Sequence, residues 1–225
     1  MTTIPNWRRP LAMSDNRKVW AFGDSYTFGH DLSDCSHDQS KPSNLTYPAL
    51  VAQRLGYDYE CRAMGYYSNE AITRTIIENI DNINDQDLVL VMWTFPIRRE
   101  FSLEDAGLMT ISREGGHEFA RHYLRHVDLD PGTMIDLSLR QIFLAQELLR
   151  GQDYFFLSAV TDLAKAITDP WLSPLVPRLD RNRWVMLDDD LGFHEWSEEQ
   201  LNTRYQYHPT DAAHELLARK ILERT

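Results

Sequence analysis

Residues 18–29 read KVWAFGDSYTFG, a short apolar run that breaks at a Gly-Asp-Ser tripeptide. The run predicts a buried strand ending near Phe22, and Gly23 permits a sharp turn because it has no Cβ and can adopt positive φ. Ser25, which follows Asp24, would then lie at the carboxyl end of a strand, where open α/β sheets bind their ligands. A serine there is a candidate nucleophile if a base reaches it, and a turn followed by a helix cap is the structural alternative.

The other end of the chain supplies a candidate base. Residues 207–222 read YHPTDAAHELLARKIL, in which four apolar side chains recur at helical spacing. This pattern predicts a helix over 210–223, and Pro209 suits its first turn. His208 would therefore stand on the loop just before the last helix. A serine near the start and a histidine near the end is an order that serine hydrolases use.

Four short blocks together resemble one known family. FGDSYTFG is similar to the first block of the SGNH (GDSL-type) hydrolases, and HPTDAAH to their last block. AMGYYSNEAI at 63–72 resembles the second block, and VLVMWTFPIRRE at 89–100 occupies the place of the third. The resemblance spans residues 18–222. It implies a single-domain, three-layer α/β/α fold with a parallel five-stranded sheet, described as flavodoxin-like.

The resemblance also implies the roles of individual residues. Ser25 would be the nucleophile and His208 the general base, and the backbone amides of Ser25 and Gly65 would form an oxyanion hole. Asp24 would tie the nucleophile loop by hydrogen bonds, with a direct charge effect on the site as the alternative. These roles describe an ester hydrolase that works through an acyl-enzyme.

The third block departs from the family pattern. That block normally ends a strand with Gly-x-Asn-Asp, whose Asn is an oxyanion donor, and this chain has Trp-Thr-Phe-Pro instead. The Thr94 hydroxyl could replace the Asn, or it could be a plain strand-end threonine. Trp93 could be a wall of the pocket or part of the core. Arg98 could bind an anionic group of the substrate or pair with a nearby glutamate, and Asn69 could support the site or cap the helix at 70–80.

The last block departs as well. The family normally has an Asp three residues before the histidine, where this chain has Tyr205, followed by Gln206. A group that fixes the tautomer of His208 has therefore to come from elsewhere. Tyr205 itself, Asp211, one of the acids at 188–190 and a backbone carbonyl are the open candidates.

Composition narrows the class of partner. With 225 residues the chain has the size of one domain, and its formal net charge of −11 argues against binding a phosphate backbone. The sequence shows no membrane-span pattern and predicts no signal peptide, which favours a cytoplasmic location and leaves a virion open. Two cysteines, Cys35 and Cys61, do not make a disulfide framework. The expected partner is a small-molecule or carbohydrate ester, without nucleic acid or membrane.

We expect neither a cofactor nor a metal. No glycine-rich nucleotide fingerprint or phosphate loop occurs. His122 and His126 share a helical face and His117 is close, but Arg121 and Arg125 between them would oppose a cation. A solvated helix is therefore the preferred interpretation of this stretch.

Alternating apolar and amphipathic segments predict strands joined by helices, and hence a parallel sheet covered on both faces. Residues 1–16 would be an N-terminal arm, and 17–225 the hydrolase-like domain. An insertion at about 96–134 breaks the alternation and would form a lid or an oligomer contact. The predicted strands are 17–22, 57–63, 88–95, 154–160 and 183–188, and the predicted helices are 46–55, 70–80, 135–149 and 210–223.

Two functions follow from these patterns. The first is a serine esterase that cleaves an acyl group, such as acetyl, through an acyl-enzyme on Ser25 with His208 as the base. The second keeps the fold as a catalytically weak or inactive binding or assembly module, because two supporting groups of the family are missing. The Trp-Thr-x-Pro-x-Arg-Arg-Glu stretch resembles divergent SGNH-type proteins of tailed bacteriophages, so the second function includes a virion component or homo-oligomer.

Overall fold

The structure is a computed structural model that describes part of the chain. The predicted arm at 1–16 lies outside the described residues, as do His117, His126, Tyr205 and Gln206. The division into an arm and one domain therefore stays a prediction. The described residues are 17–35, 40–103, 107–111, 118, 122–123, 130–204 and 207–225.

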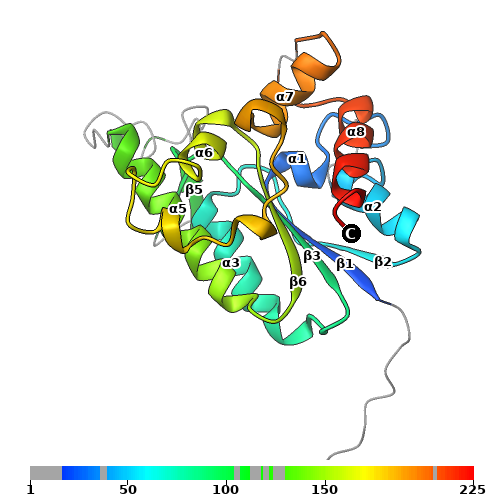
Figure 1. Cartoon of the computed structure of the whole chain (residues 1–225), viewed down its shortest axis with the longest axis horizontal. Helices are drawn as coiled ribbons and strands as arrows, with labels where there is room; N and C mark the ends of the chain where they lie inside the picture. Colours follow the sequence, from blue (N-terminus) through cyan, green and yellow to red (C-terminus); the bar gives the residue numbers. More distant parts are fainter. Residues whose placement is uncertain are drawn as a thin grey trace, which may run out of the picture.

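Four parallel strands form the centre of the fold, in the order β2-β1-β3-β6. Helices α2 and α8 pack together on one face of this sheet, and α3 and α5 pack together on the other (Figure 1). The strands are β1 (Lys18–Phe22), β2 (Asp58–Cys61), β3 (Leu88–Trp93) and β6 (Asp153–Ser158). The helices are α1 (Ser25–Phe28), α2 (Tyr47–Leu55), α3 (Asn69–Asn79), α5 (Pro131–Leu148), α6 (Thr161–Ala166), α7 (Phe193–Gln200) and α8 (Asp211–Leu222).

The topology explains where a site can form. The chain runs from β1 to β2 on one side and then crosses β1 to reach β3 on the other. All six residues of β3 are buried, as expected for a central parallel strand covered on both faces. The reversal of strand order opens a crevice at the carboxyl ends of β1 and β3, where ligands of such sheets bind. The three-layer α/β architecture is thus confirmed, whereas the flavodoxin-like description stays a prediction.

The predicted fifth strand at 183–188 is wrong. Trp184 forms a single parallel bridge with Phe156 of β6, and no ladder follows. Short 3-10 helices, Arg181–Arg183 and Asp188–Asp190, flank this bridge, so no strand is formed here. The apolar signal of this segment came from burial against β6, not from strand pairing.

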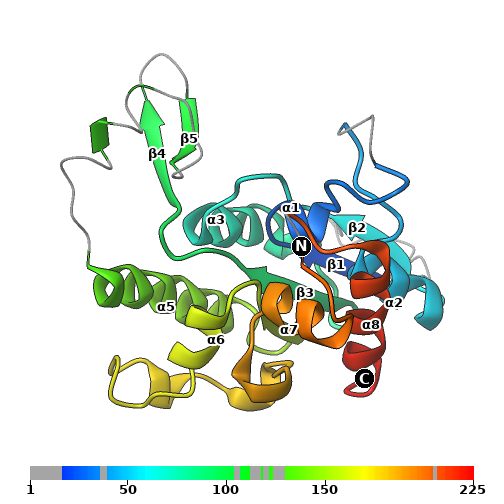
Figure 2. The ribbon, with the colours of Figure 1, turned by 90° about the horizontal axis from the view of Figure 1, so that it is seen from above.

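A hairpin lies within the insertion predicted at about 96–134. Strands β4 (Arg99–Leu103) and β5 (Gly107–Ile111) pair antiparallel, and the hairpin projects from the body of the molecule beside α3 (Figure 2). Ion pairs from Arg99 to Glu70 and from Arg74 to Glu100 tie its base to α3. No helix among the described residues is both long and apolar enough to cross a membrane.

A buried histidine joins α2 to α8. The backbone amide of Tyr47 donates to Nδ1 of His214 at 3.1 Å, and the two rings stack with centroids 6.0 Å apart. Burial lowers the pKa of the His214 imidazole from its usual 6.5 to about 3. The ring is therefore neutral in the folded protein and takes up a proton on unfolding at mildly acidic pH.

This histidine makes stability dependent on pH. Below about pH 6.5 the unfolded chain binds a proton at His214 that the folded chain does not, so its contribution is lost as the pH falls towards 3. The free energy of unfolding should fall by up to roughly 1.4 kcal/mol per pH unit from this group. Urea unfolding of the wild type and His214→Asn at pH 7, 5.5 and 4.5 measures it. The variant should show the shallower slope, and equal slopes would contradict the assignment.

Candidate active site

Ser25 is positioned by the turn that ends β1. A Cβ at Gly23 would lie 2.1 Å from Oγ1 of Thr27, so only glycine fits this turn. Asp24 caps the short helix α1, since its Oδ1 accepts a hydrogen bond from the Tyr26 amide at 3.0 Å. Ser25 is the first residue of α1 and lines a pocket at the carboxyl edge of the sheet. Both interpretations of the Gly-Asp-Ser tripeptide therefore describe the same residues: a capped turn that presents a serine.

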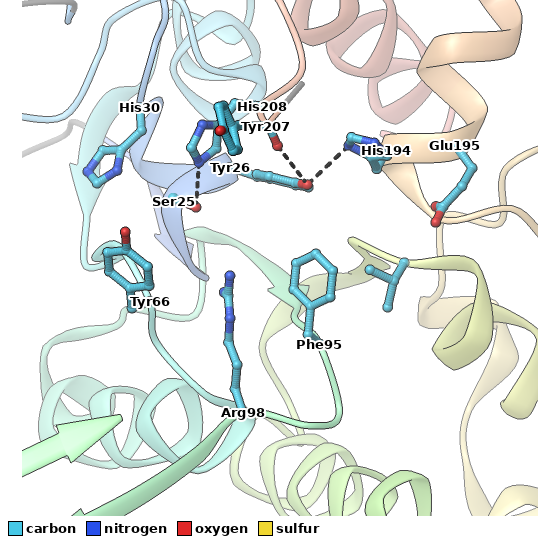
Figure 3. A pocket seen from close by; sticks show the side chains of 11 residues that line it. Ser25, Tyr26, His30, Tyr66, Phe95, Arg98, His194, Glu195, Tyr207 and His208 are labelled. Carbon is cyan, nitrogen blue, oxygen red and sulfur yellow. Dashed lines mark hydrogen bonds between the residues drawn. The ribbon is translucent and has the colours of Figure 1, made fainter. Parts of the chain in front are cut away.

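His208 reaches this serine from the loop before α8. Its Nε2 lies 3.1 Å from Oγ of Ser25, although the two residues are 183 positions apart (Figure 3). The ring of Tyr26 packs edge-on against the His208 ring, with centroids 5.6 Å apart. The hydroxyl and the imidazole thus share one cleft, at a distance suited to proton transfer.

Asp31 completes a chain of three side chains. Its Oδ2 lies 2.6 Å from Nδ1 of His208, on the side of the ring opposite Ser25. A carboxylate only accepts hydrogen bonds, so Nδ1 carries the proton and Nε2 is the acceptor that faces the serine. Asp31 adopts φ 65°, in the left-handed region that aspartate tolerates better than most residues. Its side chain remains 60% exposed.

Sequence reasoning missed Asp31 and considered other acids. Asp211 instead accepts hydrogen bonds from the amide and the hydroxyl of Ser33. Asp188 accepts from the Trp196 indole, and Tyr205 lies outside the described residues. The family pattern places the acid near the histidine in sequence, whereas here the carboxylate that contacts His208 comes from the turn after Ser25. An aspartate just after a Gly-His pair that ends α1 was the signal available.

A buried ion pair lies directly beside Ser25. Asp24 is fully buried, and its Oδ2 accepts from Oγ1 of Thr94 at 2.6 Å and from Nη1 of Arg98 at 2.6 Å. The same Nη1 also donates to Oγ1 of Thr94 at 2.8 Å. These hydrogen bonds fit the tying role that the resemblance implied for Asp24, and that role stays a prediction. The Thr94 hydroxyl gives its hydrogen to Asp24, so this arrangement leaves none for an oxyanion.

Neither Asn69, the first residue of α3, nor Trp93, the last residue of β3, lines the pocket. The Asn69 amide clamps the Thr94 backbone, because Oδ1 accepts from its N–H at 2.8 Å and Nδ2 donates to its C=O at 3.2 Å. Ser68, not Asn69, caps α3. Trp93 is 0% exposed and packs edge-on against Phe156. A substrate-binding role for Trp93 is therefore wrong, and the tryptophan belongs to the core.

Gly65 lies in the loop after β2, directly before the pocket residue Tyr66. That loop continues alongside β1, and the Met64 amide donates to the Gly23 carbonyl at 3.4 Å. A Cβ at Gly65 would lie 2.5 Å from Cε1 of His30, so the glycine allows close packing against that ring. Within the described part of the chain, the amides of Ser25 and Gly65 donate to no acceptor.

The pocket around Ser25 has a volume of about 340 Å³. Burial and the neighbouring His208 lower the pKa of His30, which favours its neutral form. On the far side, the Tyr26 hydroxyl is 3.1 Å from Nδ1 of His194 (Figure 3). Eleven residues line the pocket: Ser25, Tyr26, His30, Tyr66, Phe95, Arg98, Val160, His194, Glu195, Tyr207 and His208.

No protein-family model and no curated protein sequence matches the chain. Solved structures do match. A lipolytic G-D-S-L family protein from Desulfitobacterium hafniense gives a TM-score of 0.51 at 16% identity, over 93% of this chain and 100% of that chain. A carbohydrate esterase family 2 enzyme with a carbohydrate-binding domain, from Corynascus thermopiles (Myceliophthora fergusii), gives 0.51 at 18% identity, over 96% of this chain and 68% of that one. The fold is SGNH-hydrolase-like.

A third structure agrees with this assignment of the fold. A family two carbohydrate esterase from Clostridium thermocellum, in complex with cellohexaose, gives a TM-score of 0.51 at 13% identity. The match covers 92% of this chain and 62% of that chain. The chain therefore has a divergent SGNH-like fold. At these identities, a statement about its activity has to rest on the residues of its own site.

The described part of this SGNH-like chain holds no cluster of three or more histidine, cysteine, aspartate or glutamate side chains that could bind a metal ion. His122 is described and exposed, whereas His117 and His126 lie outside the described residues. Cys35 and Cys61 are both free thiols. The site that the structure brings together is thus one of hydroxyl, imidazole and carboxylate groups.

Breaking the buried ion pair between Asp24 and Arg98 should destabilise the fold. Asp24→Asn removes the negative partner of Arg98, which is only 8% exposed, and leaves its charge uncompensated. We expect the free energy of unfolding to fall by about 3–5 kcal/mol. Urea unfolding measures the loss, with Glu147→Gln as the matched control. Glu147 pairs with an exposed arginine, so its loss should cost less than about 1 kcal/mol. Equal effects in both variants would contradict the importance of burial.

Proposed function

We propose that this chain hydrolyses carboxylic esters through a covalent acyl-enzyme on Ser25. The observation that carries the proposal is the line of contacts from Ser25 Oγ to His208 Nε2 at 3.1 Å, and from His208 Nδ1 to Asp31 Oδ2 at 2.6 Å. A serine hydroxyl is a weak nucleophile, and a neutral imidazole in this tautomer is the base that activates it. The SGNH-like fold supports ester hydrolysis at a general level.

The reaction follows from the positions of these groups. As Oγ of Ser25 attacks the ester carbonyl, Nε2 of His208 takes the hydroxyl proton, and Asp31 stabilises the imidazolium that forms. The amides of Ser25 and Gly65 donate to the tetrahedral oxyanion. His208 then returns the proton to the leaving alkoxide. Water then attacks the acyl-enzyme while Nε2 of His208 takes one of its protons. His208 returns that proton to Oγ of Ser25, and the carboxylic acid leaves.

The pocket favours a short acyl group on a ring-bearing alcohol. Its volume of about 340 Å³ has room for a small acyl group together with a sugar ring. Tyr66 and Tyr207 line it with side chains that are 57% and 66% exposed, and Phe95 adds a third aromatic surface. Aromatic faces of this kind pack against the apolar faces of sugar rings. Together with the carbohydrate-esterase neighbours, this supports an acetylated carbohydrate as the substrate class.

An ester panel tests the proposal. The wild type and Ser25→Ala are incubated with 4-nitrophenyl esters of two to twelve carbons and with acetylated xylo- and gluco-oligosaccharides, and released acid is measured. The expected result is turnover of the acetyl esters, declining as the chain grows, and none in the variant. Turnover only of the longest chains would overturn the short-acyl assignment. No turnover by a folded wild type would overturn the esterase proposal itself.

A binding or assembly module remains the second candidate. Its favouring observation is the β4–β5 hairpin, which projects from the body of the molecule and could contact another subunit (Figure 2). The absence of the family's Asn from the third block also favours this candidate, whereas the contact between Asp31 and His208 replaces the missing Asp. A large assembly on sizing, together with an inactive and folded chain, would favour this candidate and its virion setting.

A further inference from the structure

We propose that Arg98 donates hydrogen bonds to the oxyanion that forms at Ser25, as a charged third donor beside the two backbone amides. This inference rests on the proposed esterase function. Arg98 comes from the segment after β3, where the resemblance led us to expect an asparagine and the chain has none. The residue lines the same pocket as Ser25 and His208.

The guanidinium group is held rigidly by its Nη1 edge. Nη1 donates both to Asp24, at 2.6 Å, and to Thr94, at 2.8 Å. The Cζ atom stacks 4.6 Å above the centroid of the Phe95 ring. Asp24 is the residue directly before the nucleophile, so the arginine and Ser25 are fixed to the same turn. A donor held in this way needs no reorganisation when negative charge develops.

The opposite edge of the guanidinium is available. Nε and Nη2 of Arg98 donate to no acceptor within the described residues, whereas Arg74 uses the same edge to bind Glu100. Figure 3 shows the Arg98 side chain rising between Tyr66 and Phe95 with its guanidinium group directed towards Ser25. An Nε–Nη2 edge presents two parallel N–H groups, the arrangement with which arginine binds anionic oxygens.

The contact with Asp24 favours the oxyanion over a permanently charged substrate group. Asp24 neutralises much of the arginine's charge in the resting site, which weakens the binding of an anion that is present from the start. A transient oxyanion forms on a carbonyl that is already bonded to Ser25, so a net positive charge is not needed to bring it into the site. The donor then acts in the transition state and contributes little to substrate binding.

The test measures kinetics on a neutral and an anionic ester. The substrates are 4-nitrophenyl acetate and mono-4-nitrophenyl succinate, and the proteins are wild type, Arg98→Gln and Arg98→Lys. For Arg98→Gln we expect kcat to fall about 100- to 1000-fold on both esters, with KM changed less than about threefold. For Arg98→Lys, which keeps the charge opposite Asp24 but loses the parallel edge, we expect a loss of at least about tenfold.

Arg178→Gln is the matched control, since Arg178 also stacks 4.6 Å over a phenyl ring, that of Phe143, but does not line the pocket. Its kcat should equal that of the wild type. Phenylboronic acid forms a tetrahedral anion on an active serine and so resembles the oxyanion. Its inhibition constant would not follow the loss of kcat/KM if Arg98 had only a structural role. Its inhibition constant should weaken across the Arg98 variants in proportion to their loss of kcat/KM.

Several outcomes would overturn the inference. A kcat on the neutral ester within about fivefold of wild type excludes an oxyanion donor. A loss confined to the succinate makes Arg98 a binder of substrate anions. If Arg98→Gln does not fold by circular dichroism, the folded Arg98→Lys decides alone, and unchanged kcat and boronate inhibition overturn the inference. A wild type that turns over neither ester overturns the proposed function as well, which separates the two failures.

Discussion

Ser25→Ala should lower kcat for acetyl ester hydrolysis roughly 10⁴- to 10⁶-fold, to the level of water and binding effects alone. The variant keeps the backbone amides of the site and removes the atom that, in the proposed mechanism, bonds to the acyl carbon. Oγ of Ser25 lies 3.1 Å from Nε2 of His208, which in turn contacts Asp31 through Nδ1. Steady-state kinetics with 4-nitrophenyl acetate measure the loss.

Ser102→Ala serves as the control for this substitution. Ser102 is an exposed serine on β4, away from the pocket residues, so its kcat should match that of the wild type. Thermal unfolding checks that Ser25→Ala folds, because Ser25 makes no structural contact as strong as those of Asp24. A folded Ser25→Ala protein with more than about one tenth of wild-type kcat would contradict the assignment of the nucleophile.

Asp31→Asn should lower kcat roughly 10²- to 10⁴-fold with little change in stability. The side-chain oxygen of asparagine can accept from the Nδ1–H of His208 as the aspartate does, but the neutral amide cannot stabilise the imidazolium. Its NH₂ group can also donate to an unprotonated Nδ1, which favours the tautomer with the proton on Nε2. The upper limit applies to a buried aspartate, and Asp31 is 60% exposed, so solvent screening reduces the effect. The pH dependence of kcat/KM, measured in both proteins, separates a lost charge from a misplaced ring.

Three other acids provide controls for Asp31. Asp34 lies in the same loop and bonds to Ser43 and Asn44, and Asp211 and Asp188 are bonded to groups other than His208. Asparagine at any of these positions should leave kcat within about threefold of wild type. If Asp211→Asn or Asp188→Asn costs more activity than Asp31→Asn, the orienting acid has been misassigned.

Local patterns made most of the fold predictable. An uninterrupted apolar run predicted β3, and the helical spacing of apolar residues predicted α8, because burial on both faces and on one face leave different signatures in sequence. The tripeptide after β1 pointed to Ser25, and the proline that opens the last helix pointed to His208. Both residues could be singled out because each stands in a short, recognisable stretch of chain, and the structure places their side chains 3.1 Å apart.

The features that could not be predicted depend on contacts between residues far apart in the sequence. Asp31 contacts His208 because the turn after α1 and the loop before α8 lie side by side in the fold. The two residues are 177 positions apart, and no local sequence pattern predicts their contact. Segment 183–188 looked like a strand because its apolar residues are buried, but it forms a single bridge. Arg98 was expected to face a substrate anion or an adjacent glutamate. Its actual partner, Asp24, is 74 positions away.

The most direct test of a shared Ser25–His208–Asp31 site is covalent labelling with a fluorophosphonate, followed by intact-mass measurement and peptide mapping. We predict one adduct per chain, on Ser25, with labelling slowed in His208→Ala and in Asp31→Asn. A folded wild type that stays unlabelled, or that carries its adduct on another residue, would contradict the account.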